Sequence, residues 1–67
     1  MTPVIADAVE AHIAAVTRLA RAQDAWREAA EVNASRATLA ELKGALMHEV
    51  QTRVALEDAI AVFARGP

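Results

Sequence analysis

The stretch Val32-Asn33-Ala34-Ser35-Arg36-Ala37-Thr38 separates two long helical patterns and decides how the chain folds. It is the one place in the sequence where Asn, Ser and Thr cluster, and these residues favour turns and helix caps over helix interiors. We therefore predict a turn at about residues 33–37. Thr38 and Glu41 fit a capping box, in which a Thr side chain and a Glu three residues later satisfy free backbone N–H groups at a helix start.

Before this stretch, residues 3–32 form one predicted helix. Thr2 can cap this helix, and Pro3 takes its first position, where the missing N–H costs nothing. Apolar residues recur at heptad positions a and d, and Ala fills position g: Ile5, Val9, Val16, Leu19 and Trp26, then Ala8, Ala15, Ala22 and Ala29. The pattern is typical of a coiled coil with a small-residue flank that lets a neighbouring helix come close.

After the stretch, residues 38–65 form a second predicted helix that stops at Gly66. Its apolar stripe consists of Leu39, Leu42, Leu46, Val50, Leu56, Ile60 and Phe63. Folding the chain about residues 34–35 gives apolar pairs along the whole length: Ile5 with Phe63, Val9 with Ile60, Leu19 with Val50, and Trp26 near Leu42 and Lys43. This agreement between pattern and pairing favours an antiparallel hairpin over the alternative, one unbroken helix of about 60 residues.

The 67 residues are 55% hydrophobic, yet 18 of the 37 hydrophobic residues are Ala and only 19 are larger. A chain of this size buries about 60% of its unfolded surface, and such domains are marginal alone. We therefore predict an all-α chain with a single domain, residues 1–67, folded as an antiparallel, coiled-coil-like two-helix hairpin. Two copies of this hairpin are expected to pair as a homodimer and form a four-helix bundle. The predicted dimer and core seam consists of Ile5, Val9, Ile13, Val16, Leu19, Trp26, Leu39, Leu42, Leu46, Val50, Leu56, Ile60 and Phe63.

The sequence carries no pattern typical of an enzyme. There is no Cys, which excludes thiol catalysis, disulfides and thiolate zinc sites. The segment His48-Glu49-Val50-Gln51-Thr52 matches a zinc-protease motif only in part, because Thr52 stands where the second His is needed. Ser35 is the only Ser, and no His or acid stands at triad-like positions. We expect no enzyme activity, no metal and no cofactor.

Two polar residues and one Gly interrupt the apolar seam. His12 at position d is either a hydrogen-bonded interface residue or a functional one, a pH-sensitive contact or a ligand, and the pairing above places it near Glu57. Gln23 at position a favours one register, as buried amides do in coiled coils. Gly44 within the second helix either allows a close approach near Trp26 or marks a kink.

The candidate partner-binding residues are charged or aromatic: Arg18, Arg21, Trp26, Arg27, Glu49, Arg53 and Glu57. Glu49, Arg53 and Glu57 form an i, i+4, i+8 ladder in which Arg53 is expected to face Val16. The ladder is either a solvated rim of ion pairs or a patch that docks a charged partner. Trp26 either fills the core near the turn or anchors a partner, since Trp is enriched at interfaces.

These observations predict a small non-enzymatic protein–protein interaction module. We expect a regulator or inhibitor that binds a partner protein, such as a bacterial transcription regulator, and masks its working surface. Stand-alone hairpins of this size occur among bacteriophage and plasmid regulators, and six Arg against one Lys fits a GC-rich bacterial or phage genome. The expected partners are a second copy of the chain and an unidentified protein.

Two other classes stay open. One is a structural or assembly subunit of a larger particle or secretion complex. The other is an RNA-binding four-helix dimer, with an architecture that resembles the plasmid copy-number hairpins, using Arg18, Arg21, Arg27 and Arg36. Acidic residues share this helix and the net charge is −2, so we do not expect nucleic-acid binding. The sequence shows no signal peptide and no membrane-spanning run, and we expect a cytoplasmic protein.

Overall fold

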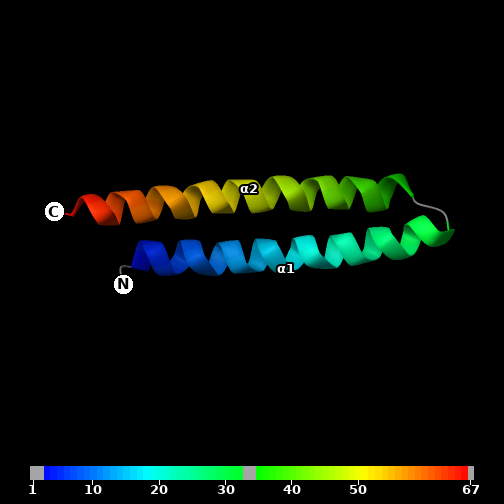
Figure 1. Cartoon of the computed structure of the whole chain (residues 1–67), viewed down its shortest axis with the longest axis horizontal. Helices are drawn as coiled ribbons and strands as arrows, with labels where there is room; N and C mark the ends of the chain where they lie inside the picture. Colours follow the sequence, from blue (N-terminus) through cyan, green and yellow to red (C-terminus); the bar gives the residue numbers. More distant parts are fainter. Residues whose placement is uncertain (1–2, 33–34, 67) are drawn as a thin grey trace.

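Two helices packed side by side make up the computed structural model, which describes residues 3–32 and 35–66 and the side chains of 5–29 and 35–66. Helix α1 spans Pro3–Val32 and helix α2 spans Arg36–Arg65. The helices run antiparallel, with both termini at one end of the molecule (Figure 1). The predicted all-helical hairpin is confirmed.

The second helix begins two residues earlier than the predicted start at residue 38. Ser35 caps it: the backbone N–H of Thr38 donates to Ser35 Oγ at 3.1 Å. The assignment of Thr38 as the cap was therefore wrong, and its hydroxyl instead lies 2.7 Å from Ser35 Oγ. At the other end, Gly66 adopts φ 71° and its N–H donates to the carbonyl of Phe63. The predicted cap Thr2 lies outside the described residues.

Small side chains form the centre of the contact between the helices. Ala15 and Ala45 are 0% exposed, and the other buried residues among the described side chains are Ala22 and Ile5. Half-buried residues flank this centre on both helices: Ala6, Ala8, Val9, His12, Arg18, Leu19 and Ala29 on α1, and Thr38, Leu42, Gly44, His48, Glu49, Thr52, Leu56 and Ala59 on α2. On α1 the contact therefore centres on heptad positions d and g, one column away from the predicted a and d, although Val9 at position a is half-buried.

The register of the hairpin differs from the predicted pairing. His12 lies beside Glu49 and Thr52, which stand eight and five residues before the expected neighbour Glu57. The predicted pairs of Ile5 with Phe63, Val9 with Ile60, and Leu19 with Val50 are therefore wrong. The observed register instead places Ile5 at the level of Leu56 and Leu19 at the level of Leu42. It follows from packing Ala against Ala, since this brings the half-buried residues of the two helices into matching layers.

This register also staggers the two helices. A helix of 30 residues is about 45 Å long, whereas the hairpin measures 55 × 14 × 12 Å. Figure 1 shows that the end of α2 extends past the start of α1, and that the end of α1 extends past the start of α2. Trp26 and Phe63 stand in the contact columns but at these staggered ends, and both are exposed. The expected place of Trp26 near Leu42 and Lys43 was wrong for the same reason.

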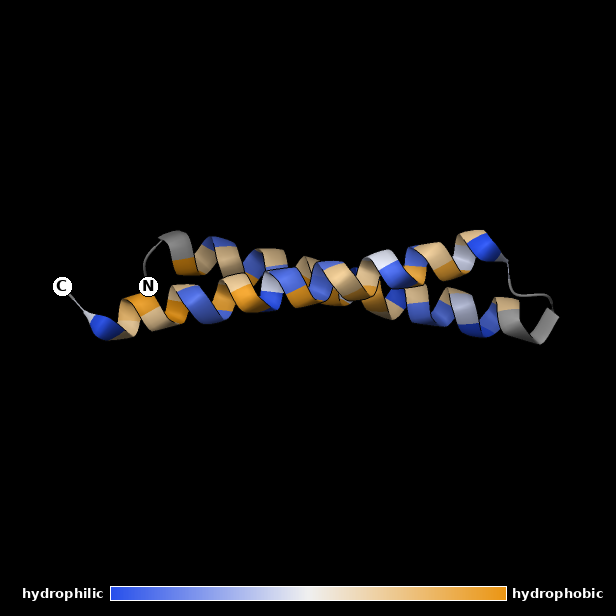
Figure 2. Cartoon of the chain, turned by 90° about the horizontal axis from the view of Figure 1, so that it is seen from above, coloured by the Kyte–Doolittle hydropathy of each residue, from blue (hydrophilic) through white to orange (hydrophobic). Residues whose placement is uncertain are grey.

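In the perpendicular view the helices cross near the middle of the hairpin, and hydrophobic segments recur along most of α2 (Figure 2). Neither α1 nor α2, over the residues that the structure describes, has the apolar length needed to cross a membrane.

Candidate protein-interaction face

Most of the large apolar side chains point outward from this hairpin instead of into its core. The exposed ones among the described side chains are Ile13, Val16, Trp26, Leu39, Leu46, Met47, Val50, Val54, Ile60, Val62 and Phe63. Ile13 is 58% exposed and Val50 is 44% exposed. A single hairpin leaves them outside because Ala residues already occupy the contact between its two helices.

Eight of these residues lie away from the Arg18–Glu41 edge, from the other edge of the helix contact round to the outer sides of the two helices, and we call them the apolar face: Ile13, Val16, Leu39, Leu46, Met47, Val50, Val54 and Ile60. On α2 they occupy three adjacent helical columns next to the column of Leu42 and Leu56. On α1 they occupy the next two columns beyond that of His12 and Leu19. Both sets lie on the side away from the Arg18–Glu41 ion pair, which bridges the helices along the other edge.

A shallow hollow marks the middle of the apolar face. It has a volume of about 280 Å³ and is lined by Leu46, Met47, Val50 and Gln51. Three of its four lining residues are apolar, so its chemistry suits an apolar side chain from another helix. The observed register brings Ile13 of α1 to nearly the same level as Val50.

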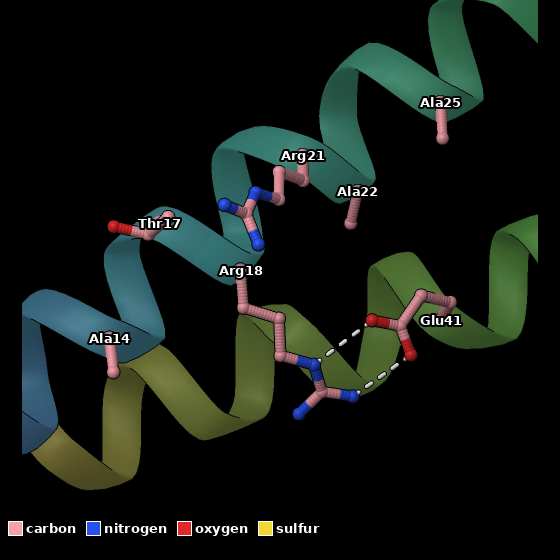
Figure 3. Close-up of a pocket in the computed structure, with 7 residues that line it drawn as sticks. All are labelled: Ala14, Thr17, Arg18, Arg21, Ala22, Ala25 and Glu41. Atoms are coloured by element: carbon pink, nitrogen blue, oxygen red, sulfur yellow. Dashed lines mark hydrogen bonds and ion pairs between the residues drawn. The ribbon is translucent and has the colours of Figure 1, made fainter.

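The opposite side of the hairpin is polar and is closed by Arg18. Its Nε and Nη2 atoms donate to the two carboxylate oxygens of Glu41, each at 2.9 Å (Figure 3). Its Nη1 atom also lies 3.4 Å from Nδ1 of His48. This hydrogen bonding lowers the pKa of the Glu41 carboxyl below its usual range and raises the pKa of Arg18. One arginine thus ties α1 to two residues of α2 that stand about two helical turns apart.

Gly44 makes room for this arginine. A Cβ atom at Gly44 would lie 3.3 Å from Nη2 of Arg18, a tight contact. The close approach that the sequence suggested near Trp26 therefore occurs beside Arg18. The surrounding hollow has a volume of about 590 Å³ and is lined by Ala14, Thr17, Arg18, Arg21, Ala22, Ala25 and Glu41. In Figure 3, Arg21 projects from the same side of α1 and makes no drawn bond to Glu41.

A second polar cluster sits at the edge of the helix contact. His12 Nδ1 lies 3.2 Å from Thr52 Oγ1, and its Nε2 lies 3.9 Å from Glu49. Arg53 Nε approaches the same Glu49 carboxylate at 3.4 Å. Of the two interpretations of His12, this geometry matches a hydrogen-bonded contact residue. Arg53 is bound to Glu49 in place of the expected position facing Val16.

The predicted partner-binding residues fall into three groups. Arg18 and Arg21 line the polar hollow, with Arg18 engaged by Glu41. Trp26 and Arg27 stand near the turn, where Arg27 makes a largely exposed pair with Asp24 at 3.6 Å. The ladder of Glu49, Arg53 and Glu57 joins the His12 cluster only through its first two members.

Sequence reasoning did not identify Met47, Val54, His48 or Thr52 as parts of these surfaces. Met47 and Val54 share one helical column, seven residues apart, and that spacing could have marked an outer apolar row. His48 and Glu41 likewise share a column, but their link to Arg18 depends on the register, which the pattern of large residues misplaced.

The described side chains include no group of three or more His, Cys, Asp or Glu residues placed to bind a metal ion. Comparison of the chain with protein-family models, curated proteins and solved structures found no match. The function is therefore argued from the surfaces of this hairpin.

Proposed function

We propose that this chain is a non-enzymatic protein-interaction module: a regulator that dimerises through the apolar face into a four-helix bundle and binds a partner protein with its outer surface. The observation that supports this proposal is the outward placement of the large apolar side chains. Burying a Val, Leu or Ile side chain contributes about 1.5–3 kcal/mol. A hairpin that leaves eight such residues on one face gains stability when another protein surface covers them.

The partner-binding surface in this proposal is the polar side, which a dimer formed through the apolar face leaves open. Arg21 lines the hollow on that side. Trp26 and Arg27 stand near the turn, Trp26 is exposed, and Arg27 shares the helical column of Ile13. Trp and Arg are the residue types most enriched among the energetic centres of protein interfaces. Since Arg18 and Arg27 are each paired with a carboxylate, this surface suits a protein better than a nucleic-acid backbone.

Affinity capture from the native host with matched variants tests this function. The tagged wild-type chain should recover one protein in stoichiometric amount, and Arg21→Glu should reduce that recovery at least about tenfold, as expected for an interface centre. Arg65→Glu makes the same charge change at the far end of the hairpin and should leave recovery unchanged. Recovery of the chain alone, or equal recovery with Arg21→Glu, contradicts the proposed partner surface.

The stagger of the helices supports a second candidate, an assembly subunit. Val62 and Phe63 are exposed on the part of α2 that extends past the start of α1. Their apolar surfaces suit end-to-end contact between hairpin dimers. For an assembly subunit, sedimentation should show a mass that grows with protein concentration, and Phe63→Ser should stop that growth while leaving the dimer intact. A constant dimer mass over a hundredfold concentration range contradicts this candidate.

A further inference from the structure

Two pairs of residues on the outer side of α2 are placed symmetrically about Val50. Leu46 and Val54 lie four residues before and after it, and Lys43 and Glu57 lie seven residues before and after it. A spacing of seven residues is close to two helical turns, so Lys43, Val50 and Glu57 share one column on the outside of α2. The outer column therefore has an apolar centre and opposite charges at equal distances from it.

Both of these charges are available to another chain. Lys43 and Glu57 are exposed. Within the described residues, 3–32 and 35–66, neither Lys43 nor Glu57 makes an ion pair. The acids that do so there are Asp24, Glu41 and Glu49. Glu57 is also four residues from Arg53, whose guanidinium is engaged by Glu49. If a second copy of this column lies antiparallel to the first, Lys43 of each copy lies opposite Glu57 of the other.

We infer that a second copy of this chain packs antiparallel across the apolar face, with the two-fold axis passing beside Val50, so that Lys43 of each copy meets the partner's Glu57. The arrangement rests on the proposed homodimer and fixes its geometry. It brings Leu46 of one copy against the partner's Val54, around the hollow lined by Leu46, Met47 and Val50. The two charge pairs form together or not at all, because the two-fold axis relates them.

The surface area of the single chain agrees with one such partner. Its accessible surface is 5032 Å² for a mass of 7.1 kDa. A compact monomer of this mass exposes about 4,100 Å², so the hairpin carries an excess of about 900 Å². A stable interface of standard size buries about 800 Å² per partner. One second copy is therefore enough to remove the excess.

Helix α1 carries a compatible pattern at the same level of the hairpin. Ile13 lies near the level of Val50, and Ala6 and Ala20 lie seven residues before and after it in the same column. An antiparallel pairing of α1 with the partner's α1 about Ile13 would place each Ala6 against the partner's Ala20. Small residues at these positions let the helices approach closely on both sides of the central Ile13 contact.

Other dimer arrangements lack this charge match. A parallel pairing of the α2 helices sets each Lys43 against the partner's Lys43, which is repulsive. A two-fold axis along the helices instead packs α2 on the partner's α1 and brings no Lys43–Glu57 pair together. Charge reversal at residues 43 and 57 therefore distinguishes the antiparallel arrangement from both.

Sedimentation equilibrium of full-length charge-reversal variants tests the inference. Lys43→Glu and Glu57→Lys each convert two attractive pairs into two repulsive ones, and each should weaken the homodimer about tenfold. An equimolar mixture of the two variants should form a heterodimer with a dissociation constant close to that of the wild type. In this mixed dimer, one chain carries a carboxylate at positions 43 and 57, and the other carries an ammonium group at both. Each pair between position 43 of one chain and position 57 of the other is therefore attractive. Asp58→Lys repeats the Glu57→Lys charge change one residue further on, outside the shared column, and should leave the dimer unchanged.

Each result of this experiment has a definite meaning. Recovery on mixing cannot come from repair of a damaged single chain, because neither variant changes the other's sequence. A wild-type dimer whose variants dimerise normally, or fail to recover on mixing, overturns the Val50 axis and leaves the proposed homodimer standing. A wild type that sediments as a monomer overturns both the axis and the homodimer.

Discussion

The two sides of this hairpin solve the same problem, joining two helices, in different ways. On the polar side, Arg18 reaches across to Glu41 and His48 and closes the edge within one chain. On the apolar side, His12 contacts Thr52 and Glu49 at the edge of the helix contact, while Ile13 and Val50 point away from the contact and remain exposed. Ala15 and Ala45 fill the contact between the two sides. The difference teaches that small residues, half-buried leucines and two polar clusters hold the hairpin, while most of its large apolar residues lie outside the helix contact.

The largest effect is expected from a charge on the apolar face. Ile13→Asp would bury a carboxylate without a partner in the dimer, which costs about 3–5 kcal/mol in a closed interface. Because we expect the hairpin alone to be marginal, the variant should be monomeric and largely unfolded, as should Leu46→Asp. Sedimentation and far-ultraviolet circular dichroism at one protein concentration measure both properties.

The adjacent residue provides a matched control for this prediction. Ala14 is exposed and lines the polar hollow, so Ala14→Asp places the same carboxylate on the opposite side of α1. This variant should remain folded and dimeric. Equal loss of structure in both variants would mean that the two sides of the hairpin do not differ in the way described.

A smaller effect is expected when the helix contact is overfilled. Ala45 is 0% exposed, and Ala45→Leu forces three more carbon atoms into the contact with α1. Overpacking of this kind costs about 1–3 kcal/mol. Urea unfolding should show the loss, whereas Ala25→Leu, at an exposed position of α1, should stay within about 0.5 kcal/mol of the wild type. If Ala45→Leu is as stable as the wild type, the small-residue contact does not set the distance between the helices.

The turn could be located from sequence, but the contact between the helices could not. The polar cluster around Ser35 and Thr38 marked the break to within two residues, because a polar side chain that bonds to the backbone, as Ser35 does, is a local signal. The register depends on which column of α1 meets α2. The stripes of Val and Leu predicted a register with Leu19 at the level of Val50, whereas the buried Ala15 and Ala22 belong to a register with Leu19 at the level of Leu42.

A test at the turn separates the observed cap from the predicted one. Ser35→Ala removes the side-chain acceptor of the Thr38 N–H group and should lower the free energy of unfolding by about 1 kcal/mol. Thr38→Val keeps the branched shape and removes only the hydroxyl, so its effect should be smaller. Chemical denaturation of both variants gives the comparison, and a larger loss for Thr38→Val would restore Thr38 as the cap.

The smallest predicted effect is a pH dependence on the polar side. The folded-state pKa of Glu41 is lowered by its hydrogen bonds from Arg18, so the unfolded chain binds its proton more readily. The stabilisation is therefore present above the unfolded pKa of about 4.3 and is lost as pH falls through the lower folded value. The raised pKa of Arg18 keeps that side chain charged throughout this range.

Glu41→Gln isolates this contribution. The difference in free energy of unfolding between wild type and Glu41→Gln should shrink as the pH is lowered from about 6 towards about 3, the range that spans the ordinary carboxyl pKa. Denaturant titrations at a series of pH values measure the difference. A difference that stays constant over this range would show that the Arg18–Glu41 bond does not contribute through ionisation of Glu41.

Much of the candidate surface also depended on the register. Leu46, Val50 and Ile60 were identified from their periodicity alone, which needs no knowledge of the neighbouring helix. The links of Arg18 to Glu41 and of His12 to Thr52 needed the observed stagger, since these residues are 23 and 40 positions apart in the chain. Local patterns therefore identify the apolar residues, but which of them point outward and which polar contacts form follow from how the two helices pack and slide past each other.

The most direct test of the central claim is the mass of the wild-type chain in solution. Sedimentation equilibrium at micromolar concentration should give twice the chain mass of 7.1 kDa, with helicity that falls when dilution dissociates the dimer. This result would agree with a hairpin whose apolar face is covered by a second copy. A stably folded, fully helical monomer of 7.1 kDa at the same concentrations would contradict the claim.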